Sequence, residues 1–439
     1  MEFAKNQFIH SANVKKSDEA TVETNSASEI VGLSNDLRST LEKGIEIIGV
    51  GKIGSKNCSV ELVDQLVMEL KKPEVDQYRA AAFLGALWMK GLSKEEEKLR
   101  VFNPCDFFQN FPKQLKELFL IITQNENLSD QQAQILAEFL MSIQDLSLDP
   151  IRLLLTAALR IRHAQTNEYV AIYQELKKSF PHWCHRVFET SHRQLIQISN
   201  PTDGFDRSMP ILPLLTEIAL RYDMNCVIPV APSSGPKFGY NDFHLAEQLQ
   251  LPFIENQQVI DHLKQPQAYY YHLHQLSSVM DHWHFLRQKM KKRPFMATLE
   301  KLVNPFCADY LITSVFHGGF NEKMLEVAQK IGYKKIIIIF RGVEGSLCLS
   351  IARSTKVLYS YQTDQGYETK EINFNPIDYG FATMIDPTID SNEIARFSQQ
   401  IQKFQMDGII DDHYQQQRIL WNRMVFDQLM QLLLNSPIV

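Results

Sequence analysis

The sequence predicts an α/β protein in which an N-terminal helical domain packs on a larger α/β domain with a mostly parallel sheet. Through residues 45–180, apolar residues recur at the spacing of amphipathic helices. After Ile196, short β-branched runs alternate with helical stretches, which is typical of parallel strands joined by helices. The chain has 439 residues, of which 44% are apolar, so it can bury the cores of two packed domains.

We divide the chain into three parts. Residues 1–43 are predicted to form a flexible N-terminal tail, because the stretch from Lys15 to Ser28 is rich in Ser, Thr, Glu, Asn and Ala and has few large apolar residues. Residues 44–195 form the predicted helical domain, and residues 196–439 form the predicted α/β domain.

The helical domain begins with a run at helical spacing from Val60, which Pro73 interrupts, and a second run follows over Tyr78–Lys90. A similar pattern returns roughly 70 residues later, which predicts a duplicated helical unit. The paired segments are Asn57–Ser59 with Asn127–Ser129, and Ala86–Lys90 with Ala158–Arg162. Helical pairs of similar pattern also arise by chance in any bundle, so both interpretations stay open.

In the α/β domain we expect strands and helices in alternation. The expected strands are Cys226–Val230, Tyr310–Val315, Lys335–Phe340 and Leu347–Ile351. The expected helices are Leu212–Tyr222, Asn241–Gln250, Ser277–Lys289 and Asn321–Gly332, with two more in Ser391–Leu434.

Composition narrows the functional classes. Forty-five basic and 51 acidic residues give a net charge of −6, so the overall balance does not indicate nucleic acid or an anionic membrane surface. The longest apolar runs, such as Ile336–Phe340, are far shorter than the ~20 residues of a spanning helix, and the N-terminus lacks a secretory core. We therefore expect no membrane partner and a cytoplasmic location.

Cysteine and histidine spacing gives no metal motif. Six cysteines without a C-x-x-C pair argue against a disulfide framework or a zinc ribbon, so we expect buried free thiols. Histidines gather in two groups, at His182, His185 and His192 and at His272, His274, His282 and His284. Neither group has recognised zinc spacing, and we predict no metal site. No G-x-S-x-G or H-E-x-x-H motif supports a hydrolase.

The first candidate binding segment is a turn between Pro201 and Pro210. It carries Asp203, Gly204, Asp206, Arg207 and Ser208 before an apolar helix. Backbone N–H groups and a helix dipole in such a turn suit an anion or a sugar. The alternative is a capped loop, in which the two aspartates only terminate the turn and the helix.

The second candidate segment, Ser233–Asp242, also follows a strand and precedes a helix. Its hydroxyls and glycines, Ser233, Ser234 and Gly239 among them, could surround a phosphate, with Lys237 as the point charge. An ordinary Gly/Pro/Ser loop is an equal alternative on these residues alone.

The third candidate segment is a basic cluster at the end of a helix. It consists of Arg287, Lys289, Lys291, Lys292 and Arg293. Arg287 and Arg293 are candidates for carboxylate or phosphate contacts, and a solvated helix C-terminus is the alternative.

In this order and spacing, the segments resemble the anthranilate phosphoribosyltransferase-like branch of glycosyltransferase family 3, which has a nucleoside phosphorylase-type fold. The resemblance spans about Gly44 to Leu433. The matching segments are Ala80–Leu84, Met89–Gly91 with Glu95, the D-G-F-D-R-S turn at Asp203–Ser208, Pro236–Gly239 with Asp242, Arg293–Pro294 through Asn304–Pro305, and the G-x-[DE]-G turn at Gly342–Gly345.

The resemblance implies pentosyl transfer from phosphoribosyl pyrophosphate with magnesium, a phosphorylated small molecule in a cleft between the domains, and a homodimer. It places Arg287 at the family's contact to the anthranilate carboxylate, and it retains Lys237, Arg293 and Glu344 as site residues. It assigns no catalytic residue.

Three departures bear on activity. Ser199–Thr202 stands where the family has G-T-G-G, and Pro201 there has no N–H to donate to pyrophosphate. Ile228–Ala231 replaces the family's K-H-G-N segment. Leu347–Cys348 replaces the acidic pair that holds magnesium, a cation that requires oxygen ligands.

Two functions follow as expectations. The first is a divergent phosphoribosyltransferase-like protein with an unidentified acceptor and without the classical activity. The alternative is a non-catalytic module on the same fold that binds a ligand or, weakly, nucleic acid through its basic cluster.

Overall fold

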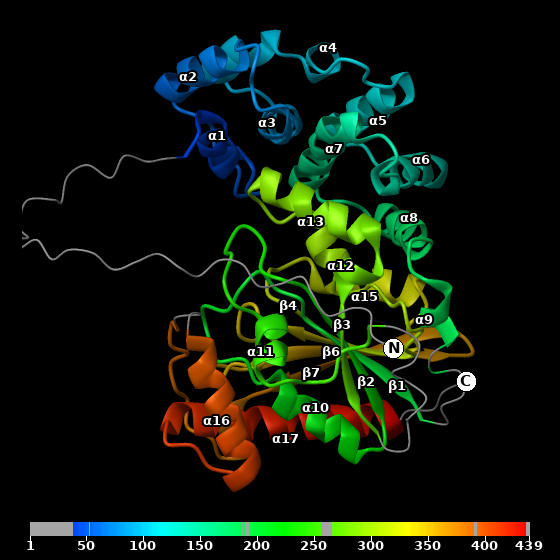
Figure 1. Ribbon diagram of the computed structural model, residues 1–439, viewed down its shortest axis with the longest axis vertical. Coiled ribbons are helices and arrows are strands. Elements are labelled where there is room, and N and C mark those ends of the chain that lie inside the picture. Colours follow the sequence, from blue (N-terminus) through cyan, green and yellow to red (C-terminus); the bar gives the residue numbers. More distant parts are fainter. Residues whose placement is uncertain are drawn as a thin grey trace, which may run out of the picture. The chain divides into compact units, whose positions relative to one another are not determined.

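Figure 1 shows the computed structural model, in which residues 38–51, 53–186, 188, 193–255, 266–389 and 393–435 are described. Ser39–Val439 belong to one compact unit. Of the predicted tail, residues 1–43, residues 1–37 lie outside the described part. Its last four residues, 40–43, form the start of helix α1 (Thr40–Ile48). His192 and residues 436–439 also lie outside the described part.

Helices make up the N-terminal part, as predicted. They are α1 (Thr40–Ile48), α2 (Val60–Leu70), α3 (Gln77–Lys90), η1 (Glu95–Val101), α4 (Pro104–Phe107), α5 (Lys113–Thr123), α6 (Asp130–Met141), η2 (Leu146–Leu148), α7 (Asp149–Arg162), α8 (Thr166–Lys177) and α9 (His182–Arg186).

The two segments of the predicted duplication have the same local role. Ser59 caps the N-terminus of α2 and Ser129 caps that of α6, each by accepting a backbone N–H three residues later. The following long helices, α3 and α7, pack closely. A Cβ on Gly85 would lie 2.2 Å from the Leu154 carbonyl oxygen, so only glycine allows this approach. The duplication itself stays a prediction.

A seven-stranded sheet forms the second part, in the order β3-β2-β1-β4-β5-β6-β7. Its strands are β1 (Leu195–Ser199), β2 (Asn225–Val230), β3 (Ala268–His272), β4 (Tyr310–Val315), β5 (Lys335–Phe340), β6 (Thr355–Thr363) and β7 (Gly366–Phe374). The first five are parallel, and β6 and β7 join antiparallel. The sheet is thus mostly parallel, and the predicted fold class is confirmed.

Four connecting helices match the expected ones closely: α10 (Leu212–Arg221), α11 (Asp242–Gln248), α13 (Ser278–Met290) and α15 (Asn321–Lys330). The short helices α12 (Leu273–Leu276), α14 (Met296–Leu299) and η4 (Pro376–Tyr379) were not expected. The chain closes with α16 (Ile394–Asp407) and α17 (His413–Asn435). The last two are the pair expected in the closing stretch, of which residues 391–392 lie outside the described part.

One expected strand is wrong. Leu347–Ile351 forms an irregular segment, although it is fully buried. Its backbone is paired with a helix side chain, because the Leu349 N–H donates to Asn422 Oδ1 of α17 and the Leu349 carbonyl accepts from Asn422 Nδ2. The sheet continues instead through the β6–β7 hairpin, which the sequence analysis did not include.

The sheet is buried on both faces, as parallel sheets are. Ile196, Ile312 and Ile337 belong to a hydrophobic cluster with α10, α16 and α17, whereas Leu195 and Leu311 belong to a cluster shared with the N-terminal helices. In Figure 1, α10, α16 and α17 cover one face of the sheet. Neighbouring residues on each strand therefore anchor two different layers.

The topology places a switch point between β1 and β4, where the order of strand addition reverses. From β1 the chain builds β2 and β3 on one side, whereas β4 starts the other side of the sheet. In open parallel sheets, ligands bind at such a switch point, beyond the carboxyl ends of the strands. The loops after β1, β2 and β4 lie at this edge.

Two smaller expectations can be compared. No helix of the described chain is both long and apolar enough to span a membrane. No disulfide joins any two of the six cysteines, all of which are described. Cys58, Cys184, Cys226 and Cys348 are buried as expected, Cys105 is half-buried, and Cys307 is exposed, contrary to the expected burial.

Candidate functional site

The loops after β1 and β2 are bonded to each other at the switch point. The Gly239 N–H donates to the Asp203 carbonyl at 3.0 Å, and the Phe205 N–H donates to the Tyr240 carbonyl at 2.9 Å. Gly204 has φ +149°, and a Cβ there would lie 2.7 Å from Gly239 Cα. Glycine is therefore required where the two candidate segments cross.

Asp203 is the centre of the site. Its carboxylate is 1% exposed and accepts two hydrogen bonds from Arg293, from Nε at 2.9 Å and from Nη2 at 2.8 Å. Arg287 Nη2 lies 3.7 Å from it. Burial opposes the charge on Arg293, but the hydrogen bonds and charge of Asp203, with smaller contributions from Glu344 and Asp206, raise the pKa of Arg293. The sequence analysis expected Asp203 to contact ligand, whereas here it binds arginine.

Arg287 is fully engaged inside the protein. Its Nε donates to the Gly235 carbonyl at 3.0 Å, and its Nη1 donates to Glu300 at 2.9 and 3.3 Å. Both side chains are buried. Burial raises the pKa of Glu300, an effect that the Arg287 charge opposes. The carboxylate partners of Arg287 are thus its own chain's Glu300 and Asp203.

The remaining predicted cations differ in position. Lys237 forms an ion pair with Asp206, with 2.8 Å between Nζ and Oδ2, and stays partly exposed. Arg207 is exposed, and its Nη1 contacts Thr388 Oγ1 at 3.4 Å. The structure therefore brings Lys237 to the crossing of the loops, while Arg207 lies at its outer side.

Several polar side chains at this edge have no hydrogen-bond partner within the described part of the chain. They are the hydroxyls of Ser199, Ser208, Ser233 and Thr313 and one carboxylate oxygen of Asp206, all buried atoms. Ser199 and Thr313 are paired in the β1–β4 register, next to the switch point. Buried polar atoms without partners are rare and require an explanation, such as bound water or ligand. The other predicted hydroxyl, Ser234, is buried in the same loop.

The third loop at the switch point comes from the Gly342–Gly345 turn. Asn200 Nδ2 donates to the Gly345 carbonyl at 3.0 Å, which ties this turn to the end of β1. Glu344 beside it is half-buried and contributes to the potential at Arg293. Hydrogen bonds and ion pairs thus join Asp203 to Gly239, Arg287 and Arg293, and Lys237 to Asp206.

Sequence reasoning missed Lys301 and Asn200. Lys301 Nζ donates to Asn200 Oδ1 at 3.2 Å and to the Ser314 carbonyl at 2.8 Å, so it bridges the ends of β1 and β4. Burial, with the charge of Arg293, lowers the pKa of Lys301 to about 8. A lysine in the apolar segment before Asn304 was the signal that could have identified it.

Arg160 of α7 was also missed as a site neighbour. Its guanidinium donates to the carbonyls of Gly49, Val50 and Arg293. Burial, with the charge of Arg293, lowers the pKa of Arg160 to about 10. Arg160 therefore fixes the helical part to the chain segment that carries Arg293.

The residues present do not fit the magnesium ion that the resemblance implies. Leu347 and Cys348 are 4% and 2% exposed, and the Cys348 Sγ lies 3.2 Å from Nη1 of the buried Arg418. Asp203 is saturated by arginine. Among the described residues, no three His, Cys, Asp or Glu side chains are placed to hold a metal ion. The second histidine group instead forms ring contacts, described below.

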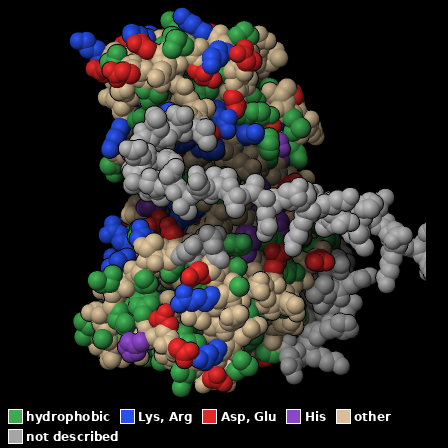
Figure 2. All heavy atoms as spheres, turned by 60° about the vertical axis from the view of Figure 1, so that its left-hand side comes forward, with side chains coloured by type: hydrophobic (Ala, Val, Ile, Leu, Met, Phe, Trp, Pro, Cys, Tyr) green, Lys and Arg blue, Asp and Glu red, His purple; other side chains and the backbone are tan. Residues whose placement is uncertain are grey.

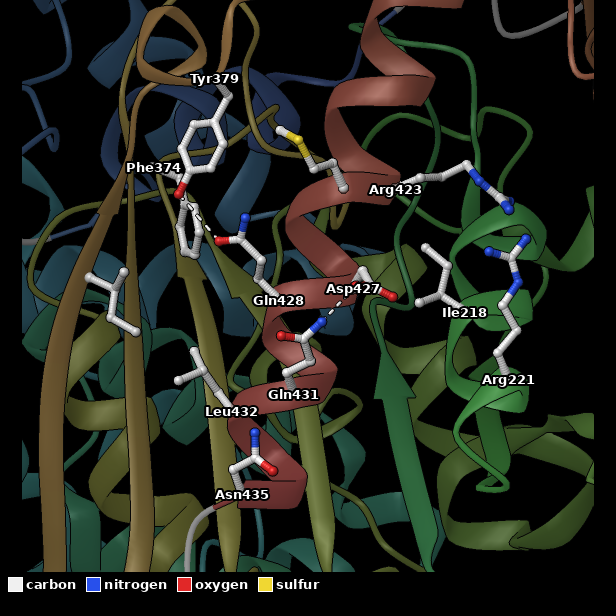
Figure 3. Close-up of a pocket in the computed structure, with 12 residues that line it drawn as sticks. Ile218, Arg221, Phe374, Tyr379, Arg423, Asp427, Gln428, Gln431, Leu432 and Asn435 are labelled. Carbon is white, nitrogen blue, oxygen red and sulfur yellow. Dashed lines mark hydrogen bonds between the residues drawn. The ribbon is translucent and has the colours of Figure 1, made fainter.

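Figure 2 shows a hollowed region between the helical part and the α/β part, with charged side chains of both signs and His side chains at its visible rim. Two surface cavities lie elsewhere. One, of 860 Å³, is lined by α10, β7 and α17 (Figure 3). Its Arg423 is already paired with Glu217, and its Asp427 accepts from Tyr222. The other is lined by residues between Met384 and Gln415. Neither cavity includes a predicted site residue.

No protein-family model matches the sequence, and no curated protein matches it. Solved structures do resemble it. Anthranilate phosphoribosyltransferase from Saccharomyces cerevisiae in complex with 4-fluoroanthranilate has a TM-score of 0.51 at 13% identity, covering 69% of this chain and 83% of that chain. The Thermus thermophilus enzyme has a TM-score of 0.48 at 15% identity, and the match covers 73% of this chain and 97% of that chain. The Saccharomyces cerevisiae enzyme in complex with PRPP and Mg has a TM-score of 0.47 at 11% sequence identity, and the match covers 85% of this chain and 90% of that chain. The chain thus has an anthranilate phosphoribosyltransferase-like fold.

Proposed function

We propose that this protein is a phosphoribosyltransferase-like protein that binds a phosphorylated pentose at the β1–β4 switch point, with an acceptor other than anthranilate and without magnesium-dependent transfer from phosphoribosyl pyrophosphate. The observation that carries the proposal is the group of partnerless hydroxyls at Ser199, Ser208 and Ser233, beside Lys237, in loops that meet where this fold class binds ligands.

The proposed ligand is small and singly phosphorylated. Lys237 and Arg293 are both partly exposed cations, but the partner of Lys237, Asp206, is itself accessible and keeps one buried oxygen without a hydrogen bond in the described structure. A phosphate would exchange this ion pair for its own charge-assisted contact with the lysine, while sugar hydroxyls would supply donors to the Asp206 oxygen. The other cations, Arg287 and Arg293, are neutralised by carboxylates. A pyrophosphate would find too little positive charge here.

Loss of the classical reaction follows from the same residues. Transfer from a pyrophosphate donor depends on positioning and on stabilising the leaving group. Pro201 removes a backbone donor in the loop after β1, and the Asn200 side chain there is bonded to Gly345, Ser314 and Lys301. These contacts fill the loop with side chains where bare backbone would be required.

A steady-state assay tests the catalytic part. With anthranilate, magnesium and phosphoribosyl pyrophosphate we expect negligible product formation. Turnover near ordinary enzyme rates, ~1 s⁻¹ or more, would contradict it.

Calorimetric titration with ribose 5-phosphate tests the binding part. Charge-assisted contacts contribute ~1.5–3 kcal/mol, so Lys237→Ala should weaken binding roughly tenfold or more. Lys334→Ala is the matched control, because Lys334 forms an exposed pair with Asp309 at 2.9 Å and lies outside the site. Equal affinity of wild type and Lys237→Ala would return this loop to a structural role. Sedimentation in the same buffer tests the homodimer that the resemblance implies.

A further inference from the structure

Four histidines lie beside the candidate site, three of them in a row of ring contacts and the fourth reached through a phenylalanine. They are His244 of α11, His272 at the end of β3, His274 of α12 and His284 of α13, and we call them the histidine shelf. The ring centroids of His274 and His284 are 4.4 Å apart, and those of His272 and His274 are 5.6 Å apart. Phe243 joins His244 to His272, with centroid distances of 5.4 and 5.2 Å. Four sequence segments thus converge on one aromatic surface.

His274 at the base of the shelf is unexplained by the fold. It is 5% exposed, and neither ring nitrogen has a hydrogen-bond partner among the residues that the structure describes. Burial lowers the pKa of His274 to about 2, with smaller contributions from the charges of His284, His272 and Arg287. Burial is also the first cause that lowers the pKa values of His244, His272 and His284. All four rings are therefore neutral near pH 7. His244 Nδ1 already bonds Asn241, His272 Nδ1 accepts from the Gln275 N–H, and His284 Nε2 contacts Gln288 Nε2, so each of these three rings offers at most one nitrogen to a ligand.

The shelf is partly exposed and adjoins the loop that carries Ser233 and Lys237. His244, His272 and His284 are half-buried. Tyr240, in the loop that contains Ser233 and Lys237, packs edge-on against His244 with ring centroids 4.9 Å apart. On α13, Arg287 lies one turn after His284 and bonds Gly235 of that same loop. One ligand could therefore contact both the loop and the shelf.

The surroundings of the shelf disfavour an aromatic carboxylate. Arg287, the residue that the resemblance assigns to such a group, already contacts Gly235, Glu300 and Asp203. A carboxylate placed beside neutral imidazoles would lose hydration without gaining a cation. A metal is disfavoured as well, because these side chains are not placed to hold one in the described structure.

We infer that the histidine shelf binds a planar, uncharged nitrogen heterocycle, which would be the acceptor group of the protein's reaction. Edge-on aromatic contacts and imidazole donors and acceptors suit a flat ring that itself carries ring nitrogens. The acceptor role rests on the proposed function, whereas the binding preference does not.

Calorimetric titration of the full chain at pH 7.5 tests the inference with two probes of similar size, benzimidazole and benzoate. We expect benzimidazole to bind at least tenfold more tightly than benzoate. His284→Ala and His272→Phe should each weaken benzimidazole binding at least fivefold, the second while keeping a ring of similar shape. His413→Ala, at an exposed position that begins α17, is the matched control and should have no effect.

The outcomes separate the two proposals. Equal binding of both probes, preference for benzoate, or unchanged affinity in both shelf variants whose circular dichroism matches wild type would overturn the inference. A parallel titration with ribose 5-phosphate reports on the proposed function alone. If the protein binds ribose 5-phosphate but not benzimidazole, only the inference about the histidine shelf is rejected. If it binds benzimidazole but not ribose 5-phosphate, only the proposed phosphate site is rejected.

Discussion

At the scale of single residues, Asp203 decides what the site can bind. Two arginines share its carboxylate in a place with 1% exposure, so the carboxylate serves the protein's own cations. Removing one partner of a buried ion pair leaves an uncompensated charge, which costs more than the pair contributes.

Asp203→Asn should therefore lower the free energy of unfolding by about 3 kcal/mol, the low end of the usual range because Arg293 is partly exposed. Urea denaturation measures it. Asp223→Asn is the control, since Asp223 is 71% exposed in its pair with Arg193, and exposed pairs contribute below about 1 kcal/mol. Similar losses in both variants would mean that Asp203 has no special position.

Residue roles were only partly predictable from the sequence. The turn composition identified Asp203–Ser208 and Lys237 as belonging to a site. It could not show that Asp203 pairs with Arg293, because these residues are 90 positions apart and meet only in the folded chain. Lys301 was overlooked for the same reason: its partner Asn200 is 101 positions away.

At the scale of elements, helices α3 and α7 approach each other closely because Gly85 of α3 has no side chain. Gly85→Ala gains about 1 kcal/mol of helix propensity, but its Cβ would lie 2.2 Å from the Leu154 carbonyl oxygen. Overpacking of this kind costs about 1–3 kcal/mol and requires both helices to move. We expect a net loss near 1–2 kcal/mol in urea denaturation. The exposed Gln77→Ala on the same helix should change stability by less than about 0.5 kcal/mol, and a stabilised Gly85→Ala would contradict the packing.

The histidine shelf predicts sensitivity to acid. The pKa of His274 is about 2 in the folded protein against 6.5 as its ordinary value, so the unfolded chain binds the extra proton between these pH values. The contribution of neutral His274 to the free energy of unfolding is therefore fully present above pH 6.5 and is lost as the pH falls below 6.5. Between pH 7.5 and pH 5.0, His274 should lower the free energy of unfolding by about 2 kcal/mol.

Denaturation of His274→Phe at both pH values isolates that contribution. The variant should lose about 2 kcal/mol less than wild type over this interval, since the other shelf histidines titrate in both proteins. An identical loss in the two proteins would show that His274 is not held neutral by burial.

Elements were easier to predict than roles, because periodicity is local. The runs at Tyr310–Val315 and Lys335–Phe340 are strands as expected. Leu347–Ile351 has the same apolar character but is paired with Asn422 of α17, a tertiary contact that no local pattern reports. The hairpin strand β7 was missed because it is mostly exposed and polar.

At the scale of the whole molecule, the basic cluster is not a free patch. Four of its five members are engaged: Arg287 binds Glu300, Lys291 lies 3.3 Å from Glu42, Lys292 donates to the Glu46 carbonyl, and Arg293 binds Asp203. With a net charge of −6, few phosphates of a nucleic acid could be neutralised.

We therefore expect only weak, non-specific nucleic-acid binding, with a Kd of ~10⁻⁴ M or weaker at about 0.15 M salt. Fluorescence anisotropy with single-stranded and duplex DNA measures it. Submicromolar binding that is lost when Lys291, Lys292 and Arg293 are replaced by Ala would favour a nucleic-acid-binding module over the proposed function.

The fold of the whole chain followed from the alternation of strands and helices, and the order of its motifs indicated the anthranilate phosphoribosyltransferase-like fold. The position of the switch point did not, because β1 and β3 were not expected as strands and the sheet order depends on them. Only the assembled sheet brings the loops of Asp203, Ser233 and Glu344 to one edge.

A crystal structure of the full chain with ribose 5-phosphate tests the central claim most directly. We predict density for the phosphate within hydrogen-bonding distance of Lys237 and the Ser233 hydroxyl, with the sugar beside the loop of Asp203. Density instead in the cavity between α10, β7 and α17, or none at the switch point under saturating ligand, would contradict the account.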